Sequence, residues 1–83
     1  MTEQEVINLC NQTISEEFEM DISQLTPEAR LREDLGFDSL DAVDMIVSLE
    51  QAFSHKLRDN ERLGQIQTLS DLHQFVIKQV IKE

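Results

Sequence analysis

Residues 31–53 read LREDLGFDSLDAVDMIVSLEQAF, and this stretch decides the fold class. A helix should begin at Asp38 or Ser39 and reach about Phe53, because Asp38 is a good N-cap and Asp41 adds a carboxylate to the first turn. Its apolar positions cover more than half of the helix surface: Leu40, Val43, Ile46, Val47, Leu49 and Phe53. This helix therefore has more apolar area than a single core contact requires.

Ser39 is the residue of this stretch that can carry chemistry. It lies at the start of the predicted helix, directly after a Gly-x-Asp turn. A helix N-terminus has free backbone N–H groups and the positive end of the helix dipole, so it favours a phosphate attached there. Asp38 and Asp41 offer carboxylates to a basic partner. The alternatives are that Ser39 is an ordinary first-turn serine and that Asp41 and Asp44 form an ordinary solvated face.

The rest of the chain predicts a small all-α bundle of three main helices and one short helix. A first helix is expected from about Glu3 to Phe18, and a last helix after Thr68. Each begins with a capping pair, Thr2 with Glu5 and Thr68 with Asp71. A short helix is expected around residues 60–63, and a long loop joins the first two main helices. Cys10 lies on the apolar stripe of the first helix and is interpreted as a small buried hydrophobe.

Length and charge narrow the function classes. At 83 residues we expect one domain, residues 1–83. The net charge of -10 argues against nucleic acids and anionic membranes and favours partners with a basic patch. No stretch is long enough to span a bilayer, and residues 1–20 do not resemble a secretory signal. A single cysteine allows no intramolecular disulfide, which fits the cytoplasm, and no metal site is expected.

The central stretch resembles the acyl and peptidyl carrier proteins, and most closely the stand-alone bacterial acyl carriers. The resemblance rests on the run from Glu33 to Asp41, which reads EDLGFDSLD, and on positions further along the helix: Val43, Asp44, Leu49, Glu50 and Phe53. Weaker similarity covers the whole chain, in a first helix, a long loop and a last helix led by a threonine.

The resemblance implies a carrier and not an enzyme. A phosphopantetheinyl transferase would use coenzyme A and Mg²⁺ to attach 4'-phosphopantetheine to the hydroxyl of Ser39, and the thiol of this arm would hold an acyl group as a thioester. The same resemblance makes the second helix the surface for synthesis enzymes with basic docking patches, through these residues: Asp38, Leu40, Asp41, Val43, Asp44, Val47 and Glu50. It also implies a monomer whose apolar helix faces form the core and can line a cavity for the acyl chain.

Parts of the sequence differ from the pattern of common fatty-acid carriers and leave the pathway open. The sequence SHKLR at residues 54–58 and the neutral Gln51 replace acidic residues common in fatty-acid carriers, so altered partner choice and weaker divalent-cation binding are expected there. Residues 27–35 and 41–44 resemble carriers of dedicated pathways such as aryl-polyene synthesis. His55 and His73 are expected at surface or boundary positions.

Three functions follow as alternatives. The chain carries acyl intermediates of fatty-acid or fatty-acid-like (polyketide or aryl-polyene) synthesis, it carries an amino acid or another non-fatty acid in a specialised pathway, or it is an unmodified interaction module. The first is the prediction. The cargo found on the arm separates the first two, and the third requires Ser39 to be dispensable.

Overall fold

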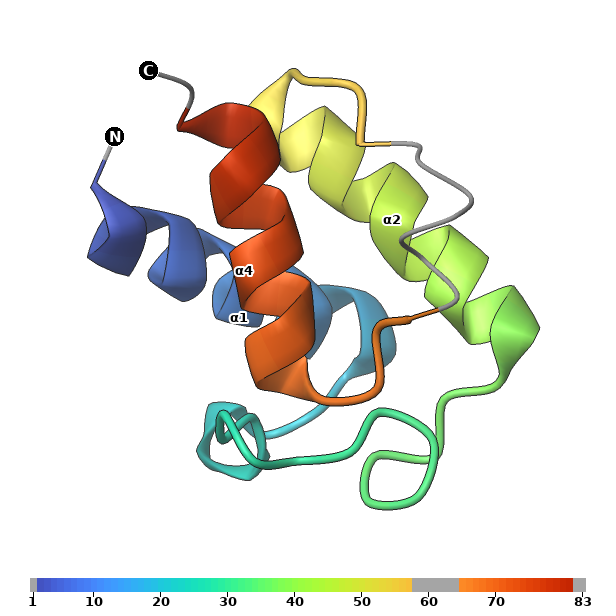
Figure 1. Cartoon of the computed structure of the whole chain (residues 1–83). Helices are drawn as coiled ribbons and strands as arrows, with labels where there is room; N and C mark the ends of the chain where they lie inside the picture. The colour runs from blue at the N-terminus through green and yellow to red at the C-terminus, as the bar shows by residue number, and fades with distance from the viewer. Residues whose placement is uncertain (1, 58–64, 82–83) are drawn as a thin grey trace.

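Three α-helices pack against one another in the computed structural model, which describes residues 2–57 and 65–81 (Figure 1). They are α1 (Glu3–Phe18), α2 (Ser39–Phe53) and α4 (Leu69–Val80), and a short 3₁₀ helix, η1 (Ile22–Gln24), follows α1. α1 packs against both α2 and α4, and the long loop between α1 and α2 runs along one end of the three helices. The all-α prediction is confirmed. The short helix expected around residues 60–63 lies outside the described residues.

Each main helix begins with a capping box, which explains why the helix starts were readable from the sequence. The N-cap residues are Thr2, Asp38 and Thr68, and in each case the side chain of the residue three positions later returns a hydrogen bond to the N-cap backbone. This reciprocal arrangement satisfies two backbone N–H groups that would otherwise lack partners in the helix. It is entirely local, so it does not depend on the rest of the fold.

The core is built mainly from one face of each helix, and four buried residues between the helices complete it: Leu25, Leu31, Phe37 and Leu57. Val6, Cys10 and Ile14 come from α1, Met45, Ile46 and Leu49 from α2, and a larger set comes from α4: Leu69, Leu72, Phe75, Val76 and Ile77. Their burial supplies the main favourable term in folding, at about 25 cal/mol per Å² of apolar surface removed from water. None of the helices within residues 2–57 and 65–81 is both long and apolar enough to cross a membrane.

The loop before α2 is held in place from two sides. The N–H of Leu31 donates to the carbonyl of Gln67 at 2.9 Å, and the N–H of Leu69 donates to the carbonyl of Ala29 at 2.9 Å. On the other side, the rings of Phe18 and Phe37 lie with their centroids 4.7 Å apart. These contacts join the residues directly before Ser39 to α4 and α1, so the start of α2 has a defined position.

Gly36 permits the turn that leads into α2. Its φ angle is +76°, a left-handed conformation that glycine adopts without the steric cost that a Cβ atom brings. Space is not the constraint, because a Cβ atom at this position would meet no atom within 4 Å. The requirement for glycine here is therefore conformational.

His73 corrects one expectation from the sequence. It was expected at the surface or a boundary, but its exposed fraction is only 3%. It lies on the core-facing side of α4, and its Nε2 atom is 2.8 Å from Oδ1 of Asn11 in α1. The hydrogen bond satisfies a polar ring that would otherwise be costly to bury. His55, which follows α2, is half-buried and so lies at a boundary.

Candidate functional site

Ser39 is the first residue of α2 and is exposed to solvent. Asp38, its neighbour, caps the helix: Oδ1 of Asp38 accepts from the N–H of Asp41 at 2.9 Å, and Oδ2 of Asp41 accepts from the N–H of Asp38 at 3.3 Å. The cap uses these carboxylates and not the Ser39 hydroxyl, which makes no hydrogen bond within the described part of the chain. The hydroxyl is therefore accessible to an enzyme that would modify it.

The first two turns of α2 present apolar side chains to water. Leu40 is 76% exposed and Val43 is 58% exposed, whereas Met45, Ile46 and Leu49 on the same helix are buried. Asp44 is exposed beside them, and Asp41 is half-buried. Exposed apolar side chains with a rim of charge are typical of a protein interaction site. Five of the predicted recognition residues thus gather around Ser39: Asp38, Leu40, Asp41, Val43 and Asp44.

The other two predicted recognition residues lie further along the helix. Val47 and Glu50 are both half-buried, and Glu50 is about 16 Å from Ser39 along the helix axis at 1.5 Å per residue. Oε2 of Glu50 accepts a hydrogen bond from the backbone N–H of Leu57 at 2.9 Å. Glu50 therefore helps to hold the segment after α2, a role that sequence reasoning did not identify.

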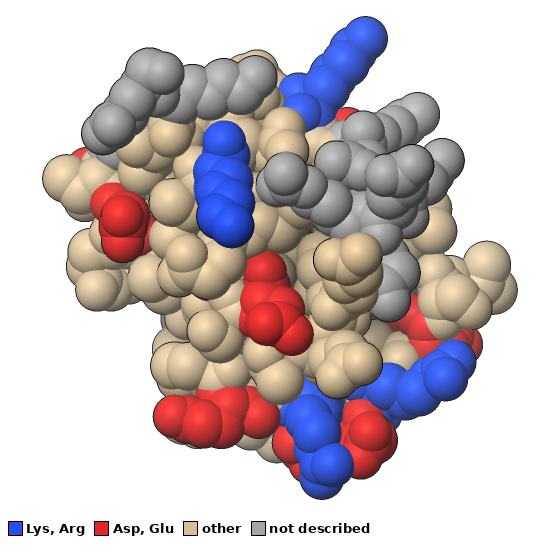
Figure 2. Space-filling view, viewed as in Figure 1, with Lys and Arg blue, Asp and Glu red and all other residues tan. Residues whose placement is uncertain are grey.

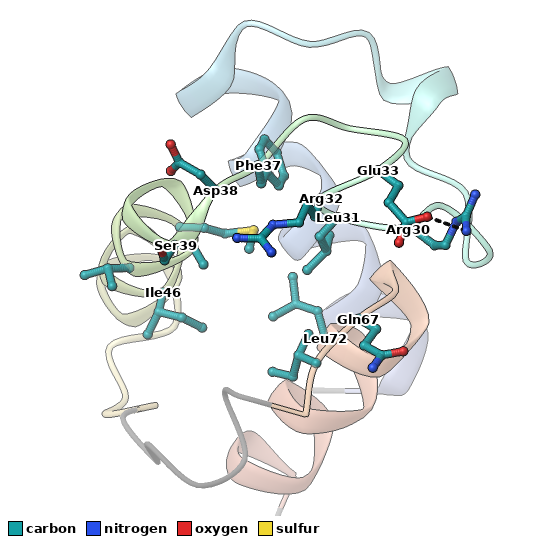
Figure 3. A pocket seen from close by; sticks show the side chains of 14 residues that line it. Arg30, Leu31, Arg32, Glu33, Phe37, Asp38, Ser39, Ile46, Gln67 and Leu72 are labelled. Atoms are coloured by element: carbon teal, nitrogen blue, oxygen red, sulfur yellow. Dashed lines mark ion pairs between the residues drawn. The ribbon is translucent and has the colours of Figure 1, made fainter.

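A pocket of about 640 Å³ opens beside Ser39, between the start of α2, the preceding loop and α4 (Figure 3). Its apolar lining includes Leu31, Phe37, Met45, Ile46 and Leu72. The volume lies in the range of about 300–1,000 Å³ that is usual for small-molecule sites. Such a pocket can take an apolar chain, and the helix and loop residues around Ser39 form one of its sides.

The loop before α2 is the place where basic side chains come near the site. Basic and acidic side chains gather together over it in Figure 2. Arg30 pairs with the carboxylates of Glu33 and Asp34. The N–H of Arg30 donates to Asp34, and this hydrogen bond, with the nearby guanidinium, holds the pKa of Asp34 below its usual value. Arg30 and Arg32 both border the pocket, and neither was singled out from the sequence.

Cys10 of α1 and His73 of α4, two side chains of reactive types, are both buried. Burial raises the pKa of the Cys10 thiol to about 12, so it stays protonated in the core, as the sequence predicted. The imidazole of His73 is buried against Asn11 in a different part of the fold. Within the described residues no group of three or more His, Cys, Asp or Glu side chains could hold a metal ion.

Comparison with known proteins identifies the class. A family model described as a phosphopantetheine attachment site matches residues 11–76. An acyl carrier protein from Thermotoga maritima is 38% identical over 77 residues, which cover 93% of this chain and 94% of that protein. An acyl carrier protein from Guillardia theta is 36% identical over 80 residues, covering 96% of this chain and 98% of that protein.

The fold is similar to that of a solved acyl carrier protein from Enterococcus faecalis, with a TM-score of 0.73 and 24% identity over 95% of this chain and 99% of that structure. The chain belongs to the phosphopantetheine-binding carriers and, within them, to the acyl carrier protein family. Its cofactor is 4'-phosphopantetheine, as the sequence predicted.

Proposed function

We propose that Ser39 is the attachment point of the phosphopantetheine arm and that the arm carries acyl intermediates of fatty-acid or fatty-acid-like synthesis. One observation supports this. The Ser39 hydroxyl is exposed at the first residue of α2, makes no hydrogen bond to the described residues, and lies beside a largely apolar pocket of about 640 Å³. The hydroxyl fits the attachment of a phosphate at a helix start, and the pocket fits an apolar acyl chain.

In the attachment step, coenzyme A supplies both the group that is transferred and the group that leaves. The Ser39 oxygen forms a bond to the phosphorus of the phosphopantetheine half, the bond between the two phosphates of coenzyme A breaks, and the nucleotide half leaves. The hydroxyl proton passes to the transferase, since no base of this chain is hydrogen-bonded to Ser39 within the described residues. Once attached, the thiol of the arm supplies the thioester chemistry. The chain itself positions the arm and is not an enzyme.

The start of α2 is the proposed docking surface for partner enzymes. Leu40 and Val43 supply apolar contact, and Asp38, Asp41 and Asp44 surround them with negative charge. A partner with a basic patch and a small apolar recess complements this surface. The net charge of -10 accelerates the encounter through long-range attraction. We also propose a single domain over residues 1–83, a monomer, and a cytoplasmic location.

Intact mass tests the attachment. The protein is incubated with coenzyme A, Mg²⁺ and a broad-specificity phosphopantetheinyl transferase, and Ser39→Ala is the control. We expect a mass gain of one phosphopantetheine group in the wild-type chain and none in S39A, because the variant lacks the attacking oxygen. The circular dichroism spectrum of S39A should match that of the wild-type chain, since the helix cap does not use the Ser39 hydroxyl.

Two outcomes would contradict the proposal. Folded, unmodified wild-type protein that gains no mass would indicate an interaction module, and equal mass gain in S39A would place the arm on another residue. The cargo is a separate question. The mass of the thioester on protein from the native host distinguishes a fatty or polyene acyl group from an amino acid.

A further inference from the structure

Arg32 occupies a position at the pocket that the proposed function does not explain. It lies in the loop before α2, is exposed, and borders the pocket together with Ser39. Figure 3 shows its guanidinium reaching across the pocket mouth toward the start of α2, while the carboxylate of Asp38 points away from it. A cation thus lies at the mouth of the pocket, on the side where Ser39 lies.

The two arginines of this loop differ in their partners. Arg30 is neutralised by Glu33 and Asp34, the acidic residues nearest to Arg32 in the sequence. Arg32 has no ion pair or hydrogen bond to any side chain within residues 2–57 and 65–81, although the chain contains 17 acidic residues. As far as the described residues go, its guanidinium fork has no anionic partner and can bind an anion that comes to the pocket mouth.

We propose that Arg32 binds the phosphodiester that modification places on Ser39. A guanidinium matches two phosphate oxygens with two parallel N–H···O bonds, which makes arginine well suited to this anion. The covalent tether raises the effective concentration of the phosphodiester at the pocket mouth, so even a weak contact is populated. The pair holds the first part of the arm over the pocket, which favours entry of the acyl chain. This inference rests on the proposed attachment at Ser39.

The phosphodiester fits Arg32 better than other anions do. It is a permanent charge, and its bond to Ser39 fixes it at the edge of the pocket that Arg32 reaches. A carboxylate on the cargo would lie at the far end of a long flexible arm. If that arm entered the pocket, the carboxylate would lie among Leu31, Phe37 and Ile46, where an unpaired charge is costly.

A comparison of unmodified and modified protein tests the contact. Wild type, Arg32→Gln, Arg32→Lys and Arg30→Gln are each loaded to completion, as judged by intact mass, and thermal midpoints are measured at low salt before and after loading. R30Q is the matched control, because it removes the same charge from the same loop and pocket rim but its guanidinium is already paired.

Loading shifts the thermal midpoint of each protein, and we expect the shift of wild type to be about 1–5 °C more positive than that of R32Q. This is the effect that one exposed ion pair has on the midpoint of a domain of this length. R32K should fall between them, and R30Q should behave as wild type. Salt at 0.5 M should remove the difference, because it screens exposed charges. The ³¹P resonance of the loaded wild type should also move with salt toward its position in R32Q.

Several results would overturn the inference. Equal midpoint changes and equal ³¹P positions in wild type and R32Q would exclude the contact. If R30Q loads and R32Q cannot be loaded, Arg32 serves the transferase. If the difference appears only with a succinyl arm and not with the bare arm, the partner of Arg32 is the cargo. Absence of a mass gain in every chain, in contrast, contradicts the attachment at Ser39 itself.

Discussion

Ser39 and Cys10 show how position sets the chemistry of a single side chain. Ser39 is exposed at the start of α2, where its hydroxyl can meet another enzyme. Cys10 is fully buried in α1, and burial raises the pKa of its thiol to about 12. The only thiol of the polypeptide thus stays neutral and enclosed. It does not compete with the thiol of the arm for an acyl group.

His73 gives the fold a pH-dependent term. Burial lowers the pKa of its imidazole, so the folded state favours the neutral ring that bonds Asn11. With the pKa lower in the folded state than in the unfolded state, the unfolded chain binds more protons as the pH falls below about 6.5. The contribution of His73 to stability is therefore complete above pH 6.5 and declines as the pH falls toward the folded-state pKa.

We predict that wild type loses stability relative to His73→Leu between pH 7 and pH 5, because the variant has no proton to take up at this site. Denaturant unfolding at several pH values measures the difference. His55→Gln is the control, since His55 is half-buried and outside the core. The carboxyls of Glu5, Asp34 and Asp71 have lowered pKa values, so their contributions are lost only below this window. A pH-independent difference between wild type and H73L would contradict the prediction.

At the scale of the element, α2 combines a structural and a functional task in its first turn. Asp38 caps the helix and is also a proposed contact for a basic partner. The cap needs an oxygen that accepts from the N–H of Asp41, whereas the docking contact needs a charge. A substitution that keeps the oxygen but removes the charge separates these two requirements.

We predict that Asp38→Ala lowers the free energy of unfolding by about 1 kcal/mol, whereas Asp38→Asn changes it by less than about 0.5 kcal/mol, because asparagine keeps the accepting oxygen. Both variants should be loaded more slowly by the transferase, since both lose the charge. Urea unfolding and loading rates measure the two effects. Asp44→Asn is the control for removing an exposed charge without a cap. If D38N is as unstable as D38A, the cap is not the source of the loss.

At the scale of the whole molecule, the excess of negative charge opposes the compact state. The net charge of -10 is carried by only 83 residues, and Figure 2 shows acidic side chains distributed over one face, not gathered into one patch. Mutual repulsion at short spacing destabilises a small fold and is screened by ions.

We predict that the thermal midpoint rises with added NaCl and with millimolar Mg²⁺, because both reduce repulsion among the carboxylates. The rise should be gradual and without saturation, since no cluster of three or more ligand side chains occurs within the described residues. Calorimetry over a range of ion concentrations measures it. An unchanged midpoint would exclude repulsion as a significant term, and saturation at a low Mg²⁺ concentration would indicate a specific binding site.

The sequence determined the features that depend on neighbours along the chain. The bounds of α1 and the starts of α2 and α4 were predicted correctly, because capping boxes and helical periodicity are set within a few residues. Ser39 and the acidic and apolar residues around it could be proposed as a site for the same reason, since they share one continuous stretch.

The tertiary structure alone decided what depends on distant residues. The hydrogen bond between Asn11 and His73 joins positions 62 residues apart, and the pocket needs the loop, α2 and α4 together. The orientation of Arg32 toward Ser39 depends on hydrogen bonds that join its loop to residues 67–70. Local sequence patterns cannot predict these features. A side chain becomes buried, or comes to face another across a pocket, only when separate segments of the chain pack against one another.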